Sequence, residues 1–499
     1  MVKLEQNYRS TQSILNAANE VIKNNKGQIP KNLWTANSEG EKIRLVRMMT
    51  DNDEGKYVAD TIQEQKLRNH YNNRDFAILY RTNAQSRAFE ESLRRMAIPY
   101  TMYGGVSFYQ RKEIKDLIAY LRIIVNPRDE ESLKRIINYP TRGIGKTSID
   151  RAVLAANEQN ITLWEVLQRA REFAFKAGTL EAVENFVLMI RSFASMLATK
   201  NAYEVAQHVG KQTNLVKELF NDKTTEGLAR YENIQELLNS IKEFTERPDE
   251  DGVLEEETKG LGNYLQQITL LTDADEKDPN ADTVKLMTIH AAKGLEFSCV
   301  FAAGLEEMLF PNAMSINTRE ELEEERRLFY VVITRAKERL WITYANTRYR
   351  FGTLVQNEPS RFIEEIPSDF LDRSFAGGGA RNQGGFQERS AFDRMHGGIG
   401  TASQAEKRYA PPPAKKETKP AYVPPKPYTK TIEHNPSPDF IPSDTSSLQV
   451  GQKVEHQKFG FGEVVGMEGS THNPIATVKF QYNGEKKIML NYAKLRIVE

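Results

Sequence analysis

Two arginines in polar surroundings are the residues of this sequence best suited to phosphate chemistry. Arg9 follows Tyr8 just before a helical pattern, and an aromatic ring beside an arginine can stack on a base while the guanidinium reaches a phosphate. Arg335 lies near the end of the helical pattern 323–337. An arginine delivered from there across a domain interface to a transferring phosphate is the arginine-finger arrangement. A solvated, charged helix explains either residue taken alone.

A polar loop between two apolar runs, residues 288–297, supplies a second set of candidates. Ligands of open α/β sheets bind at strand ends of this kind. Thr288 and His290 can donate hydrogen bonds to a phosphate or sugar, and Gly294 permits a close approach of the backbone. Glu296 can accept a hydrogen bond from a ribose hydroxyl. In isolation, His290 also fits a structural histidine.

A third segment, Tyr139 to Ser148, contains Gly-Lys-Thr but departs from a phosphate-binding P-loop. A P-loop needs a glycine where this chain has Pro140, and proline removes a backbone donor. The segment instead resembles a helix-hairpin-helix turn, whose exposed amides would hold duplex phosphates without sequence preference. The predicted duplex contacts are Gly143, Gly145, Lys146 and Thr147. A plain helix-capping turn is the alternative.

The elements that must position these residues follow from the periodicity. Alternating or continuous apolar runs predict strands at 43–48, 76–80, 284–289 and 340–344. Amphipathic patterns such as 11–25 predict helices between them, so an α/β sheet domain is expected. From about 113 to 276 the pattern is almost wholly helical, which indicates an insertion into that domain.

The last quarter of the chain changes composition twice. Residues 377–400 are glycine-rich, and residues 411–442 contain ten of the twenty prolines, which predicts a disordered linker. Residues 450–498 then alternate again, and Asn483-Gly484 between alternating runs is a strong hairpin signal. Several strands in so short a segment predict a small barrel-like β module.

Bulk composition limits the classes of protein that the chain can belong to. Its 499 residues, 39% hydrophobic and 27% charged, predict a soluble protein of more than one domain. No apolar run reaches the roughly 18 to 20 residues of a membrane span, so a cytoplasmic location is the default. Cys299, the one cysteine, excludes an internal disulfide and a cysteine-based metal site. The 68 basic and 68 acidic residues cancel, so any nucleic-acid binding must come from local patches.

Taken together and in this order, the three motifs around Arg9, residues 288–297 and Arg335 resemble those of the superfamily one DNA helicases of the PcrA/UvrD/Rep group. The resemblance covers Leu4 to about Phe362. It implies a RecA-like, P-loop NTPase-type second motor domain interrupted by a helical insertion. It also implies a nucleotide set, with Tyr8 near the adenine, Arg9 and Arg335 on the γ-phosphate, and Glu296 on the sugar beside Gly294.

The same resemblance implies a track for single-stranded DNA, formed by Arg81, Asn83, Thr288, His290 and Phe351. Phosphate contacts combined with aromatic stacking are what sequence-independent strand binding requires. The cofactor implied is ATP with Mg²⁺, and the direction of movement implied is 3′ to 5′. The function implied is that of an ATP-dependent DNA helicase in repair and replication, with single-stranded and duplex junction DNA as partners.

A complete P-loop and an apolar strand ending in paired acidic residues are both missing from the sequence. The family carries these parts on a first motor domain that precedes the tyrosine-arginine motif. We therefore expect an N-terminally truncated form with no metal ligands of its own, inactive for ATP hydrolysis alone. The expected domains are 1–109 and 278–373 for the motor, 110–277 for the insertion, 374–446 for the linker and 447–499 for the β module.

The β module resembles the Tudor-like domain of PcrA-type helicases, which implies RNA polymerase as a partner. Its lysines, which a solvated barrel surface also explains, are Lys453, Lys458, Lys479, Lys486, Lys487 and Lys494. A non-catalytic adaptor that binds DNA and RNA polymerase is the alternative function. A helicase-nuclease is a third possibility, but the proline-rich linker and β module argue against it because that class ends in a carboxylate-rich nuclease domain.

Overall fold

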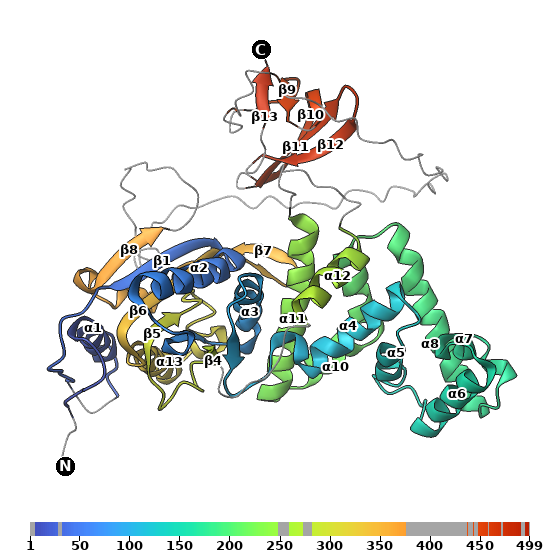
Figure 1. Cartoon of the computed structure of the whole chain (residues 1–499), viewed down its shortest axis with the longest axis horizontal. Coiled ribbons are helices and arrows are strands. Elements are labelled where there is room, and N and C mark those ends of the chain that lie inside the picture. The colour runs from blue at the N-terminus through green and yellow to red at the C-terminus, as the bar shows by residue number, and fades with distance from the viewer. Residues whose placement is uncertain are drawn as a thin grey trace, which may run out of the picture. The chain divides into compact units, whose positions relative to one another are not determined.

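The computed structural model describes residues 5–27, 32–247, 259–272, 282–375, 437, 443, 448–457, 459–470, 473–490 and 495–498. The chain forms two compact units, Met1–Gly377 and Gly378–Glu499 (Figure 1). The predicted linker 374–446 and the predicted boundary at 277 lie almost entirely outside the described residues, and β8 continues to Phe375.

An eight-stranded sheet with the order β3-β4-β2-β5-β6-β1-β8, and with β7 paired to β6, forms the centre of the first unit. The strands are β1 Ile43–Thr50, β2 Phe76–Tyr80, β3 Tyr100–Met102, β4 Val284–Thr288, β5 Phe297–Ala302, β6 Ala336–Arg350, β7 Thr353–Gln356 and β8 Leu371–Phe375. All pair in parallel except β7 with β6. The four strands predicted from periodicity are confirmed.

Both faces of the sheet are covered by helices, which explains why β2 is buried along its whole length. On one face, Ala77 and Leu79 join a core with α1 Gln12–Lys23 and α13 Arg319–Ile333. On the other, the alternate residues of β2 join a core with α2 Asp51–Asn69 and α3 Ser86–Arg95. Cys299 of β5 lies in this second core, as expected of a buried strand residue. The unit also contains α14 Arg361–Glu364 and the short 3-10 helices η1 Asn73–Asp75, η2 Asn83–Gln85, η3 Phe108–Gln110, η7 Ala313–Ser315 and η8 Ser368–Phe370.

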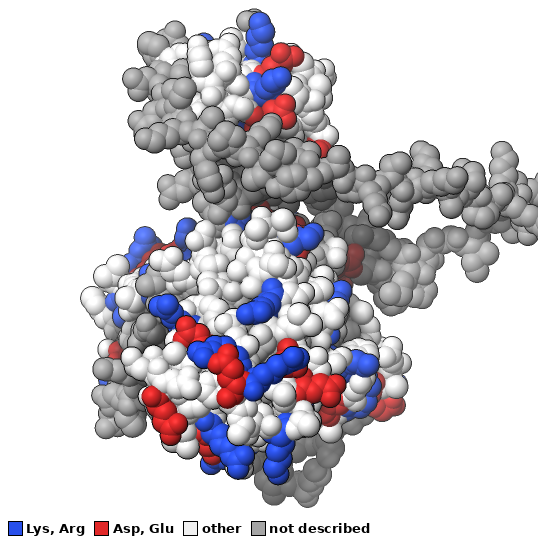
Figure 2. Space-filling view, turned by 90° about the vertical axis from the view of Figure 1, so that its right-hand side faces the viewer, with Lys and Arg blue, Asp and Glu red and all other residues white. Residues whose placement is uncertain are grey.

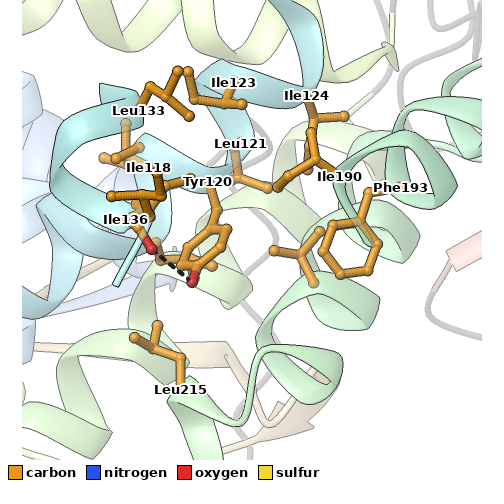
Figure 3. Close-up of a cluster of buried hydrophobic side chains, with 14 of the residues drawn as sticks. Ile118, Tyr120, Leu121, Ile123, Ile124, Leu133, Ile136, Ile190, Phe193 and Leu215 are labelled. Carbon is orange, nitrogen blue, oxygen red and sulfur yellow. Dashed lines mark hydrogen bonds between the residues drawn. The ribbon is translucent and has the colours of Figure 1, made fainter. Parts of the chain in front are cut away.

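Between β3 and β4 the described chain is helical, so the predicted helical insertion is confirmed. Its helices are α4 Lys112–Val125, α5 Glu130–Ile136, α6 Lys146–Gln159, α7 Leu163–Gln168, α8 Ala177–Ser195, α9 Ala202–Gln212, α10 Leu215–Asn221, α11 Thr225–Glu246 and α12 Leu261–Thr272, with η4 Ala170–Glu172 and η5 Met196–Ala198. They share one hydrophobic core. Figure 3 shows its centre, where Tyr120 of α4 lies among apolar side chains and donates a hydrogen bond to the carbonyl of Ile136 at 3.4 Å.

The second unit is a five-stranded antiparallel sheet in the order β12-β11-β10-β9-β13. Its strands are β9 Lys453–His456, β10 Gly460–Ser470, β11 Asn473–Phe480, β12 Gly484–Met489 and β13 Leu495–Val498. The predicted hairpin at Asn483-Gly484 is confirmed, because β11 pairs with β12 up to Phe480 and Gly484, and Gly484 has a φ of 70° that favours glycine. The predicted β module is therefore present. Two of its predicted lysines, Lys458 and Lys494, lie outside the described residues.

A buried ionic network joins helix α11 to the sheet domain. Arg87 of α3 contacts Glu236 of α11 at 2.6 Å and also contacts Asp51, Glu91 and Glu243. Burial raises the pKa of Glu236 to about 7, although Arg87 opposes the shift. The folded chain therefore holds a proton on this carboxyl more tightly than the unfolded chain does.

This shift predicts a stability that falls as pH rises. A carboxyl whose folded pKa is raised stabilises the fold below its unfolded pKa, and the contribution is lost as pH rises through the folded value. As the pH rises from about 4.5 to 7, we expect the melting temperature of the parent to fall by ~2–4 °C more than that of Glu236→Gln. Thermal denaturation of both proteins across this range measures the difference. Glu226→Gln, an exposed change on the same helix, should follow the parent, and a Glu236→Gln profile parallel to the parent would contradict the prediction.

Candidate nucleotide and DNA site

Three segments far apart in the sequence meet where β5 and β6 begin. The Ser10 hydroxyl donates to the carbonyl of Ala336 at 2.6 Å, and the amide of Thr11 donates to the carbonyl of Lys337 at 3.0 Å. The amide of Phe297 donates to the carbonyl of Arg335 at 3.0 Å. These bonds hold the segment before α1, the start of β5 and the start of β6 against one another. Arg9, Glu296 and Arg335 are thereby brought to one edge of the sheet.

Glu296 lies between two cations at this edge. Arg9 Nε donates to its Oε2 at 2.5 Å, and Lys337 Nζ lies 3.0 Å from its Oε1. Hydrogen bonds from Arg9 and Lys337 lower the pKa of Glu296, so it is ionised at neutral pH. With Arg335 nearby, the cluster holds three cations and one carboxylate, which suits an anionic ligand. Sequence reasoning missed Lys337, for which the only signal was a basic residue two positions after Arg335.

Arg335 is held by the backbone around it. Its guanidinium donates to the carbonyls of Val331 at 3.1 Å and Leu295 at 2.8 Å, and to the hydroxyl of Thr334 at 3.2 Å. Burial lowers its pKa, and the neighbouring Arg9 adds to the effect, but arginine keeps its charge in proteins. The sequence suggested a side chain free to project from the end of a helix. The structure places it just beyond α13, oriented by three hydrogen bonds.

Tyr8 and Gly294 leave the rest of this edge open. The Tyr8 ring is 78% exposed, and its hydroxyl donates to Gln6 Oε1 at 2.6 Å. Gly294 has a φ of +91°, and a Cβ at this position would meet no heavy atom within 4 Å. A flat group stacked on Tyr8 therefore meets no obstruction from the tyrosine's own surroundings. Arg9 also donates to the carbonyl of Thr334 at 3.3 Å.

The residues predicted to bind DNA lie at the opposite edge, where β2 and β4 end. Thr288 is the last residue of β4 and pairs with Tyr80, and the amide of Ile289 donates to the carbonyl of Tyr80 at 2.9 Å. His290 is exposed beside them. Partial burial and the charge of Arg81 lower the pKa of His290, which favours the neutral ring at neutral pH. The loop 289–296 thus joins the two edges, since β4 and β5 are parallel.

Arg81 is committed to an ion pair that the sequence did not reveal. Its Nε and Nη2 donate to the carboxylate of Glu325 of α13 at 2.7 to 3.1 Å, and Glu325 also accepts from the amide of Asn312 at 3.0 Å. The side chains are 18% and 4% exposed. Arg81 therefore braces the sheet edge against α13. A phosphate would have to compete with Glu325 for it.

Helix α11 supports the remaining residues of this edge. Arg111 Nη1 donates to the carbonyl of Asn83 at 3.0 Å and to Asn233 Oδ1 of α11 at 2.8 Å. The contact to Asn83 uses its backbone, and the Asn83 side chain is exposed. Phe351, at the tip of the β6–β7 hairpin, is 69% exposed. Asn239 of α11 donates to the carbonyl of Tyr349 at 2.9 Å and accepts from the amide of Gly352 at 3.0 Å, so both sides of the hairpin tip are clamped.

The predicted duplex contacts form a turn at the start of α6. Gly145 caps the helix, while Gly143 has a φ of +82° and open space around it. Buried Ile144 anchors the turn, and Asn138 Oδ1 accepts from its amide at 3.1 Å. Lys146 and Thr147 are exposed. Figure 2 shows basic and acidic side chains interspersed over the molecular face on this side of the first unit, so local amides must contribute much of any duplex contact.

The described part of the chain shows neither a metal-binding cluster nor a membrane-spanning helix. There, no group of three or more His, Cys, Asp and Glu side chains is placed to hold a metal ion. No described helix has both the length and the apolar composition to cross a membrane.

The chain belongs to the UvrD-like helicase family, because residues 2–347 match the UvrD-like helicase C-terminal domain. Residues 450–496 match the PcrA/UvrD tudor domain. The family resemblance and the α/β fold with a separate β module are thereby confirmed.

Relatives with assigned activities extend this match. The ATP-dependent DNA helicase PcrA of Staphylococcus aureus (strain Mu50) is 44% identical over 376 residues, covering 75% of this chain and 50% of the relative. The PcrA of Staphylococcus epidermidis (strain ATCC 12228) is 39% identical over 495 residues, covering 99% of this chain and 61% of the relative. The chain spans about half the length of the curated relatives it matches.

Proposed function

We propose that this chain supplies the second motor domain of an ATP-dependent DNA helicase that moves 3′ to 5′ along single-stranded DNA in cytoplasmic repair and replication. The observation that carries the proposal is the convergence of Arg9, Arg335 and Lys337 around Glu296, beside the exposed ring of Tyr8. A cationic cluster next to an open aromatic face suits a nucleoside triphosphate.

The residues present fit the predicted nucleotide contacts. The Tyr8 ring stacks on the adenine, Glu296 accepts from a ribose hydroxyl, and Arg9 and Arg335 neutralise charge on the γ-phosphate. Arg9 is paired with Glu296 in the structure. When the nucleotide binds, the Arg9 guanidinium therefore leaves the Glu296 carboxylate and contacts the γ-phosphate. Mg²⁺ supplies charge neutralisation on the phosphate oxygens, and its ligands belong to a first motor domain.

The two edges of one sheet give a route from hydrolysis to movement. Nucleotide contacts lie at the start of β5 and β6, strand contacts lie at the end of β2 and β4, and the loop 289–296 connects them. Arg335 donates a hydrogen bond to Leu295, in the loop 289–296 that also contains His290. Closure of a first motor domain on Arg335 therefore displaces this loop and, with it, His290. Each cycle of closure and release shifts the strand across this surface.

A complementation assay tests this function. The chain alone should not hydrolyse ATP, with or without single-stranded DNA. Adding the part of the Staphylococcus epidermidis relative that lies outside the matched region should produce strand-stimulated hydrolysis. Hydrolysis by the purified chain alone that Arg335→Ala abolishes would mean that the chain completes its own phosphate site, and would overturn the division of labour proposed here.

The turn at the start of α6 is proposed to contact duplex DNA. Replacing Lys146 with alanine should weaken duplex binding at all sequences and reduce the slope of log K against log salt by about 0.9, because one phosphate contact is lost. Titrations of a fluorescent duplex at several salt concentrations measure the slope. Lys176→Ala, an exposed lysine of the same insertion, serves as the control. Equal slopes for parent and Lys146→Ala would favour a plain capping turn.

The β module matches the PcrA/UvrD tudor domain, and it is proposed to dock on RNA polymerase, the partner implied by its resemblance to the Tudor-like domain of PcrA-type helicases. Exposed apolar side chains on its strands and turns, including Phe461, Met467 and Tyr482, offer a contact surface. Binding of purified polymerase to the full chain, compared with a chain ending at residue 377, would test this partner.

A further inference from the structure

Three aromatic rings from three different elements form a row on the first unit. Phe220 lies in the last turn of α10, Tyr231 lies in the first half of α11, and Phe351 lies at the tip of the β6–β7 hairpin. The ring centroids of Phe220 and Tyr231 are 5.4 Å apart, and those of Tyr231 and Phe351 are 6.5 Å apart. The two outer rings are 54% and 69% exposed. Rings this exposed contribute little to the core and leave part of their surface accessible to a ligand.

The row continues the edge where the strand residues lie. Tyr231 is followed by Glu232. Burial raises the pKa of Glu232, and the charge of the neighbouring Arg81 opposes this shift. Asn233 comes next and shares Arg111 with Asn83. One turn of α11 therefore borders the predicted strand contacts on one side and Phe351 on the other. Phe220 lies beyond Tyr231, on the insertion.

A cation accompanies the outermost ring. Lys223 Nζ lies 4.1 Å from the centroid of the Phe220 ring and donates to the Phe220 carbonyl at 2.8 Å. Its side chain is exposed. A lysine over an aromatic ring combines the two contacts that a single strand needs, the ring for a base and the ammonium for a phosphate. The spacing of the rings leaves no room for a base between them, so bases stack on the outer faces.

We propose that Phe220 is a second base-stacking position for single-stranded DNA, through which the helical insertion takes part in holding the strand that passes Phe351. This rests on the proposed function, since it extends the same strand track. Tyr231 packs between the two exposed rings, and Lys223 contacts a phosphate. Every base has a flat face, so binding here is independent of sequence.

Equilibrium binding of fluorescent oligothymidylate to the full chain tests the proposal. Phe220→Ala should weaken binding about tenfold, the loss of one stacked base. Phe220→Tyr keeps the ring and should bind like the parent, and Leu188→Ala, another exposed side chain of the insertion, should also match the parent. Lys223→Ala should reduce the salt slope by about 0.7. An oligonucleotide containing 2-aminopurine should show fluorescence quenching that Phe220→Ala diminishes.

The outcomes separate this proposal from the proposed function. If the parent does not bind the single strand, the proposed strand track fails. If Phe351→Ala weakens binding while Phe220→Ala binds and quenches like the parent, the track stands and the second position is overturned. An equal loss on blunt duplex would also overturn it, because paired bases present no free face. Melting temperatures close to the parent's show that the variants fold.

Discussion

Replacing Arg335 with alanine is expected to lower strand-stimulated ATP hydrolysis by about 10³-fold or more in a motor assembled from this chain and a first motor domain. The guanidinium is held by the carbonyls of Val331 and Leu295, so it is oriented before the nucleotide arrives. Such an arginine stabilises charge that develops on the transferring phosphate, and alanine leaves that charge unmatched.

The two edges of the sheet make this prediction specific. Strand binding should remain close to that of the parent in Arg335→Ala, because Thr288 and His290 lie at the opposite edge from Arg335. Arg327→Ala, which removes a half-exposed arginine of α13 paired with Glu324, should hydrolyse ATP like the assembled parent. Steady-state phosphate release measures both variants. A rate for Arg335→Ala within tenfold of the parent would exclude this residue as the arginine finger.

The elements were predictable because their signals are local. The run 76–80 is apolar throughout, as a strand covered on both faces must be, and the structure buries all five residues. Asn483-Gly484 predicted its hairpin from two residues whose backbone preferences fit the turn.

The chemistry of the site was less predictable because its contacts join distant residues. The loop 288–297 reads as one motif, but its two ends lie at opposite edges of the sheet, since it connects two parallel strands. The pair of Arg81 with Glu325 spans 244 residues. Neither Lys337 nor Phe220 has a distinctive neighbourhood in the sequence, and each gains its meaning from a partner on another element.

The largest loss of stability is expected from replacing Arg348 of β6, which lies at a buried junction of carboxylates. Its guanidinium contacts Glu306 at 2.8 Å, Glu54, and Asp51 at 3.6 Å. Glu54 and Glu306 are completely buried. Glu306 also accepts from the amide of Ala345 at 2.8 Å, and Glu54 accepts from the amide of Gly304 at 2.8 Å, so both carboxylates organise the backbone at this end of the sheet.

Arg348→Met should therefore destabilise the first unit by about 3–5 kcal/mol, because removing one member of a buried pair leaves uncompensated charge. The tryptophans, at positions 34, 164 and 341, are all in this unit, so denaturant titration followed by tryptophan fluorescence reports on it alone. Arg68→Met breaks an exposed pair with Glu64 and should cost less than about 1 kcal/mol.

The sign of the pH dependence gives a second check. Burial raises the pKa of Glu306, and Arg348 opposes the shift. Without Arg348 the pKa rises further, so the defect should be largest above neutral pH and smaller where the carboxyl is protonated. Adding Glu306→Gln to Arg348→Met should recover part of the lost stability, since one buried charge is removed. A double variant no more stable than Arg348→Met at pH 8 would show that lost packing, and not unpaired charge, dominates at this junction.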